Sequence, residues 1–132
     1  MQVLIIEHNG DLAAIWAAFL GRAGLSCKVV ASAAEARAAL RAETFGALVL
    51  DVELPGGEAF EVADFAGYRD PDVPIIAVTP RDFFSDGAVF ELIPNARGVL
   101  HQPLRPEDMA ALVEHYGMRH AQTRGAGASG GG

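Results

Sequence analysis

Residues 46–57 read GALVLDVELPGG, and this stretch decides the fold. It opens with a continuous apolar run, residues 47–50, which is too short for a helix and lacks the alternation of a strand with one face in water. Such a run is typical of a strand covered on both faces, as in a parallel sheet flanked by helices. The Pro-Gly-Gly cluster then marks a loop. The stretch therefore predicts a buried central strand that is followed by an acidic residue, Asp51.

The same unit recurs along the chain, with a short apolar run followed by a longer segment whose apolar residues have helical spacing. The strands are expected at residues 3–6, 26–30, 46–50, 73–78 and 96–100. The helices are expected at residues 11–23, 32–42, 58–67 and 82–92, with a last helix from about residue 106 to Gly117. Ser32 and Glu35 form a capping-box signature at the start of the second helix. This alternation predicts an α/β fold built on a parallel sheet.

Length and composition limit what the protein can be. Its 132 residues suit a single domain, expected at residues 1–117, with a glycine-rich and disordered tail at 118–132. The net charge of -7 disfavours nucleic-acid binding, which depends on clustered basic residues. With one cysteine, Cys27, and no basic leader or long apolar segment, we expect a cytoplasmic protein that neither spans nor enters a membrane.

Polar side chains follow the predicted strands where the strands end. Glu7 and His8 follow the first strand, Asp51 the third and Thr79 the fourth, and His101 and Gln102 follow the fifth. In open parallel sheets, ligands bind outside the carboxyl ends of the strands. We therefore expect the functional site at this edge. His101 is predicted to point away from Gln102 by strand alternation and is not counted in the site.

These residues resemble the receiver domain of two-component response regulators. Residues 49–56, VLDVELPG, are similar to that family's phosphoacceptor motif, and residues 73–79, VPIIAVT, to its fourth-strand motif. The resemblance implies a flavodoxin-like, doubly wound five-stranded sheet in the order 2-1-3-4-5. It also implies that Asp51 is the phosphoacceptor and that Thr79 is the switch hydroxyl.

The resemblance further implies a Mg²⁺ site made by Glu7, His8, Asp51 and the backbone carbonyl of Glu53. Here His8 replaces an acid that in the family touches the metal directly, so we expect magnesium binding to be weakened. A set of carboxylates with an imidazole suits manganese or zinc better.

Two more departures concern the phosphoryl group and the switch. Gln102 replaces the phosphate-binding lysine, and a neutral amide contributes no charge. Lys28, the only lysine, is predicted at the opposite end of the sheet. Arg81 and Arg105 are alternative cations, although arginines in such places are more often solvated, and Arg81 is also expected to face Glu53. Phosphorylation of Asp51 is therefore expected to be weak or absent.

The predicted function is that of an atypical, stand-alone and non-enzymatic receiver domain that acts through a protein partner. Val99 stands where the family has a switch aromatic, so the usual coupling to Thr79 is expected to be absent or altered. The partner, a histidine kinase or a downstream effector, is expected on the face of the fourth helix, fifth strand and fifth helix. That face carries Phe83, Phe84, Phe90 and Val99.

Two other functions are alternatives to this one, of which the first resembles part of the sequence and the second lacks a feature it needs. Asp51 and Glu53 with Thr79 are similar to the nucleophile region of haloacid-dehalogenase-type phosphatases, in which Asp51 would be the nucleophile. A flavodoxin-like cofactor binder would need a phosphate-cradling loop after the first strand, where this chain has the acidic Glu7. The remaining histidines, His115 and His120, are predicted to be surface residues.

Overall fold

The computed structural model describes residues 1–80 and 86–131, with the side chains of residues 1–80 and 87–122. The elements in chain order are β1 (Gln2–Ile6), α1 (Gly10–Arg22), β2 (Ser26–Val30), α2 (Ala33–Ala42), β3 (Ala47–Asp51), the 3₁₀ turn η1 (Pro55–Gly57), α3 (Ala59–Arg69), β4 (Ile75–Thr79), α4 (Asp86–Leu92), β5 (Ala96–His101) and α5 (Pro106–Gly131). The five strands are parallel, in the order β2-β1-β3-β4-β5. The predicted fold and strand order are confirmed.

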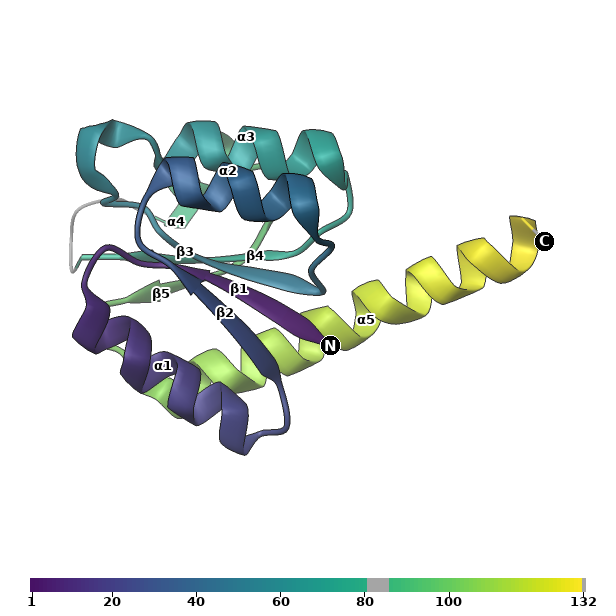
Figure 1. Cartoon of the computed structure of the whole chain (residues 1–132), viewed down its shortest axis with the longest axis horizontal. Helices are drawn as coiled ribbons and strands as arrows, with labels where there is room; N and C mark the ends of the chain where they lie inside the picture. The colour runs from purple at the N-terminus through teal and green to yellow at the C-terminus, as the bar shows by residue number, and fades with distance from the viewer. Residues whose placement is uncertain (81–85, 132) are drawn as a thin grey trace.

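Helices cover both faces of the sheet (Figure 1). Helices α2, α3 and α4 pack on one face, and α1 and α5 pack on the other. The central strands supply both cores, since Leu4 faces one cluster and its neighbour Val3 faces the other, both fully buried. This double coverage explains why the strands are continuous apolar runs.

Local signals set the helix starts. The side chain of Asn9 accepts hydrogen bonds from the backbone N–H groups of Asp11 and Leu12, at 3.0 and 3.2 Å, and so begins α1 directly after the end of β1. Ser32 accepts from the N–H of Glu35 at 3.2 Å and donates to its carboxylate at 3.1 Å, which confirms the predicted capping box. The start of α1 therefore fixes the loop that carries His8.

The last helix does not end at Gly117, so that prediction is wrong. Helix α5 continues to Gly131 and projects beyond the body of the domain (Figure 1). Gly117 is a point of close approach, because a Cβ there would collide with the side chain of Met1. The division into a domain at residues 1–117 and a disordered tail at 118–132 stays a prediction.

Two smaller observations complete the fold. The predicted fourth helix is confirmed from Asp86 to Leu92, while residues 82–85 lie outside the described part of the chain. Among the described residues, no helix combines the length and apolar character needed to cross a lipid bilayer.

Candidate functional site

The carboxyl ends of the strands gather the polar residues predicted for the site. Asp51 is the last residue of β3, and Glu7 and His8 follow β1, its neighbour in the sheet. Thr79 is the last residue of β4, which pairs with β3 on its other side. Parallel pairing brings these strand ends to one edge, as predicted.

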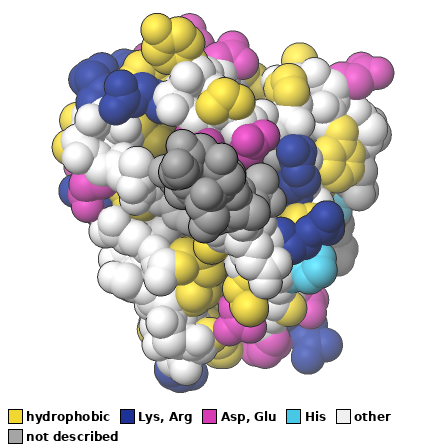
Figure 2. Space-filling view, turned by 90° about the vertical axis from the view of Figure 1, so that its right-hand side faces the viewer, with side chains coloured by type: hydrophobic (Ala, Val, Ile, Leu, Met, Phe, Trp, Pro, Cys, Tyr) yellow, Lys and Arg dark blue, Asp and Glu magenta, His cyan; other side chains and the backbone are white. Residues whose placement is uncertain are grey.

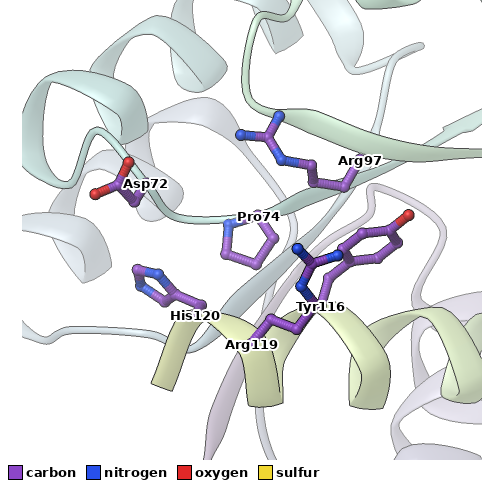
Figure 3. Close-up of a pocket in the computed structure, with 6 residues that line it drawn as sticks. All are labelled: Asp72, Pro74, Arg97, Tyr116, Arg119 and His120. Carbon is purple, nitrogen blue, oxygen red and sulfur yellow. The ribbon is translucent and has the colours of Figure 1, made fainter. Parts of the chain in front are cut away.

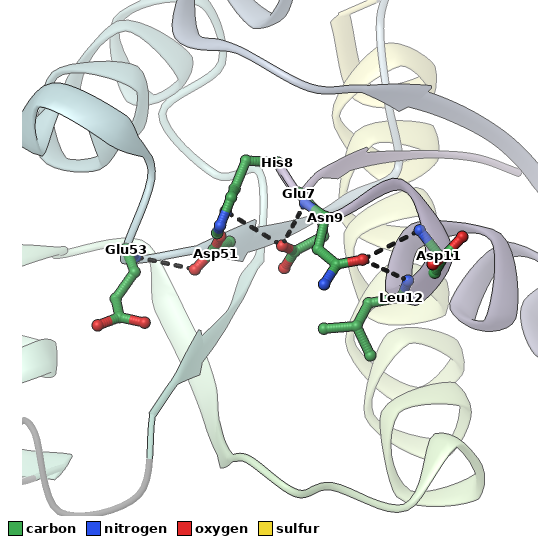
Figure 4. Close-up of polar contacts among 7 residues, drawn as sticks. All are labelled: Glu7, His8, Asn9, Asp11, Leu12, Asp51 and Glu53. Atoms are coloured by element: carbon green, nitrogen blue, oxygen red, sulfur yellow. Dashed lines mark hydrogen bonds and ion pairs between the residues drawn. The ribbon is translucent and has the colours of Figure 1, made fainter.

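Asp51, the predicted phosphoacceptor, is bonded through both carboxylate oxygens (Figure 4). Its Oδ2 lies 2.6 Å from Nδ1 of His8, and its Oδ1 accepts the backbone N–H of Glu53 at 2.8 Å. Asp51 is 3% exposed, whereas the His8 side chain is 45% exposed. The imidazole therefore covers a buried carboxylate from the solvent side.

Glu7 is a buried acid beside this pair. Its Oε1 accepts the backbone N–H of Asn9 at 2.9 Å and lies 3.3 Å from Nδ1 of His8. Its Oε2 is buried and has no hydrogen-bond partner among the described residues. Burial, with a smaller contribution from the charge of Asp51, raises the pKa of Glu7 to about 7 against the lowering effect of the Asn9 bond. The hydrogen bond to Asp51 is the main cause that raises the pKa of His8.

Glu7, His8 and Asp51 form a potential metal-ligand set. One ligand atom from each residue lies within 4.8 Å of those of the other two. The set comprises two carboxylates and one imidazole, so it differs from the all-oxygen coordination that magnesium prefers. Glu53 contributes its N–H to Asp51, and a ligand role for its carbonyl stays a prediction.

Thr79, the predicted switch hydroxyl, has a partner that could not be predicted from the sequence. Its side chain is fully buried, and Oγ1 lies 2.9 Å from Nδ1 of His101. His101, which was not counted in the site, thus contacts a predicted site residue, although it is not part of the ligand set of Glu7, His8 and Asp51. The signal that could have found it is the register, because Thr79 and His101 are paired last residues of two adjacent parallel strands.

Gln102 lies next to the switch position through its backbone. Its N–H donates to the carbonyl oxygen of Thr79 at 2.8 Å, and its side chain is half-buried. Val99, at the position of the switch aromatic, is half-buried and packs against the core under α2, α3 and α4.

The cations considered as substitutes for the missing lysine lie elsewhere or are paired. Lys28 bonds to Glu43, which follows the carboxyl end of α2, at 2.6 Å, so its predicted place away from the site is confirmed. Arg105 is exposed and lies 3.3 Å from Glu107. Arg81, with its expected pairing to Glu53, lies outside the described residues.

The last helix carries two histidines that were predicted to be surface residues, but only one of them is exposed. His115 is exposed, as predicted. His120 is 5% exposed and bonds to Asp70, so its assignment to the surface is wrong. Helix α5 continues past Gly117 and carries His120 against the segment that follows α3.

The sheet has a flavodoxin-like strand order, with a buried acid after β1, another at the end of β3 and a threonine at the end of β4. This arrangement defines an α/β signalling domain with an acidic site at the carboxyl edge of the sheet. The chain belongs to the response regulator receiver domain family, whose family model matches residues 3–114. It is therefore a receiver domain of two-component signalling. Receiver domains are generally non-catalytic, bind magnesium for phosphorylation and interact with kinases and effectors.

Similar proteins agree with this assignment. The chain is 27% identical over 118 residues to the DNA-binding transcriptional regulator NtrC of Escherichia coli K12, which covers 86% of this chain and 25% of NtrC. The chain thus spans about a quarter of the length of that relative.

Two solved structures share the fold. A CheY-like receiver domain protein from Methanospirillum hungatei JF-1 has a TM-score of 0.81 at 23% identity, covering 92% of this chain and 97% of that one. A response regulator receiver protein from Sinorhizobium medicae WSM419 has a TM-score of 0.80 at 19% identity, covering 91% and 96%.

Proposed function

We propose that this chain is a divergent receiver domain in which phosphoryl transfer to Asp51 is weak or absent and which signals through a protein partner. The observation that carries the proposal is the 2.6 Å contact between Nδ1 of His8 and Oδ2 of Asp51. A hydrogen bond between an imidazolium and a carboxylate is charge-assisted and stronger than a neutral one. It holds the nucleophilic carboxylate in an internal pair.

Phosphoryl transfer to Asp51 would require this pair to open. Its other carboxylate oxygen, Oδ1, is already bonded to the N–H of Glu53, so Oδ2 is the oxygen that His8 withholds. Proton-bound or imidazole-bound carboxylates are poorer nucleophiles, because their lone pairs are engaged. The rate of acyl-phosphate formation should therefore be low.

The residues at the site do not fit magnesium well. Magnesium demands near-octahedral oxygen coordination, and His8 offers a nitrogen where the family offers a carboxylate. Nδ1 of His8 also bonds to Asp51, which is itself one of the expected magnesium ligands. We propose that magnesium binding is weakened.

Charge balance gives a third reason for weak phosphorylation. A transferred phosphoryl group brings negative charge beside Glu7 and Asp51, and lysine normally offsets part of it. Gln102 supplies hydrogen-bond donors without charge. Lys28 is paired with Glu43 at the other end of the sheet and does not replace it.

The proposed docking face consists of α4, β5 and α5. Phe90 and Leu92 on α4 are 43% and 48% exposed, and Val99 on β5 is half-buried. Phe83 and Phe84, also expected on this face, lie outside the described residues. The exposed apolar side chains favour a protein partner, a histidine kinase or a downstream effector, over a nucleic acid. We place this interaction in the cytoplasm and propose no enzymatic turnover.

The phosphorylation proposal is tested by restoring the family's residues. The protein is incubated with acetyl phosphate and Mg²⁺, and its intact mass is followed. We expect little phosphoryl adduct on the wild type and a clear gain in the double variant His8→Asp/Gln102→Lys. The matched control is His8→Asp/Gln122→Lys, which adds the same charge on an exposed position of α5. Adding Asp51→Asn to the first double variant should abolish the adduct.

The outcome that contradicts the proposal is ready phosphorylation of the wild type that disappears in Asp51→Asn. A haloacid-dehalogenase-like phosphatase would instead be indicated by steady hydrolysis of a generic phosphate ester that depends on Asp51.

The docking face is tested separately. A variant with Phe90→Ala and Leu92→Ala should lose the partner in a pull-down with the full chain as bait. The control Tyr68→Ala removes a large side chain that is 82% exposed on α3, and it should retain the partner. If the α4 variant keeps every partner that the wild type binds, the proposed face is wrong.

A further inference from the structure

A second candidate site lies at the opposite edge of the sheet from Asp51, where the strands begin. A pocket of about 210 Å³ opens there between β4, β5 and the late turns of α5 (Figure 3). Its lining residues are Asp72, Pro74, Arg97, Tyr116, Arg119 and His120. They come from the segment before β4, from β5 and from α5. The pocket exists because α5 continues past Gly117.

His120 is the anchored polar group of this pocket. Its side chain is 3% exposed, and Nε2 lies 2.9 Å from Oδ2 of Asp70, fifty residues earlier in the chain. Because a carboxylate can only accept when ionised, Nε2 carries the proton and donates it. The other ring nitrogen, Nδ1, is buried and has no partner among the described residues. With the proton on Nε2, Nδ1 is an acceptor, so a hydrogen-bond donor from outside the chain would satisfy it.

The charged groups of the pocket favour an anion. Arg97 and Arg119 both line it together with Asp72, whose carboxylate opposes them, while the nearby carboxylate of Asp70 is bonded to Nε2 of His120. Nη1 of Arg97 donates to the carbonyl oxygens of Pro94 and Ala96, at 3.1 and 3.2 Å, which fixes the guanidinium at the pocket. These bonds use one of its three nitrogens.

Two arginines thus line one pocket in a chain whose net charge is -7. Figure 2 looks onto this side of the molecule, where basic, acidic and hydrophobic side chains are interspersed. Guanidinium groups match planar or tetrahedral oxyanions through paired N–H donors. The ring of Tyr116 adds a flat apolar wall.

We propose that this pocket binds a small oxyanion, a carboxylate or phosphate compound, between Arg97 and Arg119, with Nδ1 of His120 accepting a hydrogen bond from a hydroxyl group of the ligand such as that of hydrogen phosphate. The volume lies below that of typical drug-sized pockets, so the ligand is a small one. Binding would bridge α5 to the start of β5 and would stabilise the folded state by mass action. This site is independent of phosphorylation at Asp51.

The test uses the full chain and two probes, inorganic phosphate and succinate, titrated separately and followed by backbone amide NMR. We expect saturable shifts centred on Arg97, Tyr116 and His120 for at least one probe. The double variant Arg97→Gln/Arg119→Gln should weaken that affinity about tenfold or more. Arg22→Gln is the control, because it removes an exposed arginine on α1 whose guanidinium lies over Phe19.

The relative affinities of the two probes distinguish the two classes of ligand, and other outcomes would contradict the proposed site. Tighter binding of phosphate indicates a phosphate compound, and tighter binding of succinate a carboxylate. Asp51→Asn should leave the response unchanged, which separates this pocket from the phosphoacceptor site. The proposal is overturned if neither probe gives saturable shifts at these residues, or if the double arginine variant binds as tightly as the wild type.

Discussion

The buried carboxyl of Glu7 should make the stability of this domain fall as pH rises. Burial raises its pKa from an ordinary value near 4.5 to about 7, so the folded state holds a proton that the unfolded state releases. When the pKa of a group is higher in the folded state than in the unfolded state, its contribution to stability is fully present at pH values below the unfolded pKa. That contribution is lost as the pH rises through the folded pKa. For Glu7 this window runs from about pH 4.5 to about pH 7. The shift corresponds to about 3 kcal/mol of unfolding free energy.

His8 should extend this decline to higher pH. Its pKa is raised above 6.5, chiefly by the hydrogen bond to Asp51, so its contribution is present below pH 6.5 and is lost as pH rises through the folded value. The side chain is 45% exposed, and solvent screening makes its share smaller than that of Glu7. The two groups act in the same direction.

The assay is denaturant unfolding at a series of pH values in a chelating buffer, so that no divalent ion competes with the protons. Glu7→Gln should remove most of the decline between about pH 4.5 and about pH 7, since an amide oxygen can still accept from Asn9. Glu107→Gln, which changes an exposed acid on α5, is the control. If the unfolding free energies of the wild type and of Glu7→Gln depend on pH in the same way, Glu7 does not hold the extra proton of the folded state. His8→Asn should flatten only the upper part of the curve.

Three further changes test how the scaffold is held. Ser32→Ala should cost about 1 kcal/mol in denaturant unfolding, because it removes the N-cap of α2. Asn95→Asp should cost about 1–3 kcal/mol, because its amide donates to two carbonyls before β4, at 3.0 and 3.1 Å, and a carboxylate cannot. Gly56→Ala should cost about 1–2 kcal/mol in thermal or chemical unfolding, because Gly56 has φ 78°; equal stability of the variant would contradict that conformation.

The strands could be predicted from the sequence because burial leaves a local trace. Each central strand is a run of apolar residues that are buried on both faces, as in residues 3–6. Their carboxyl ends share one edge in any parallel sheet, so the convergence of Glu7, Asp51 and Thr79 followed from chain order alone. The capping box at Ser32 is equally local, since its partner is three residues away.

The contacts of His101 and His120 could not be predicted in the same way. The partner of His101 lies 22 residues away, and that of His120 lies 50 residues away. Both contacts depend on long-range packing, namely the β4–β5 register and the course of α5. The end of the last helix was wrongly predicted at Gly117 for a related reason. Glycine often ends helices through a positive φ, but it also permits close approach of other atoms, here those of Met1.

The two predicted departures at the candidate site change its charge in opposite directions. Where the family has an acid, His8 removes a negative charge, and where the family has a lysine, Gln102 removes a positive one. The remaining carboxylates, Glu7 and Asp51, share the imidazole, whose Nδ1 lies 3.3 Å from one and 2.6 Å from the other. The test in which both residues are restored is therefore the informative one, because it changes the two groups whose charge differs from that of the family at this acidic site.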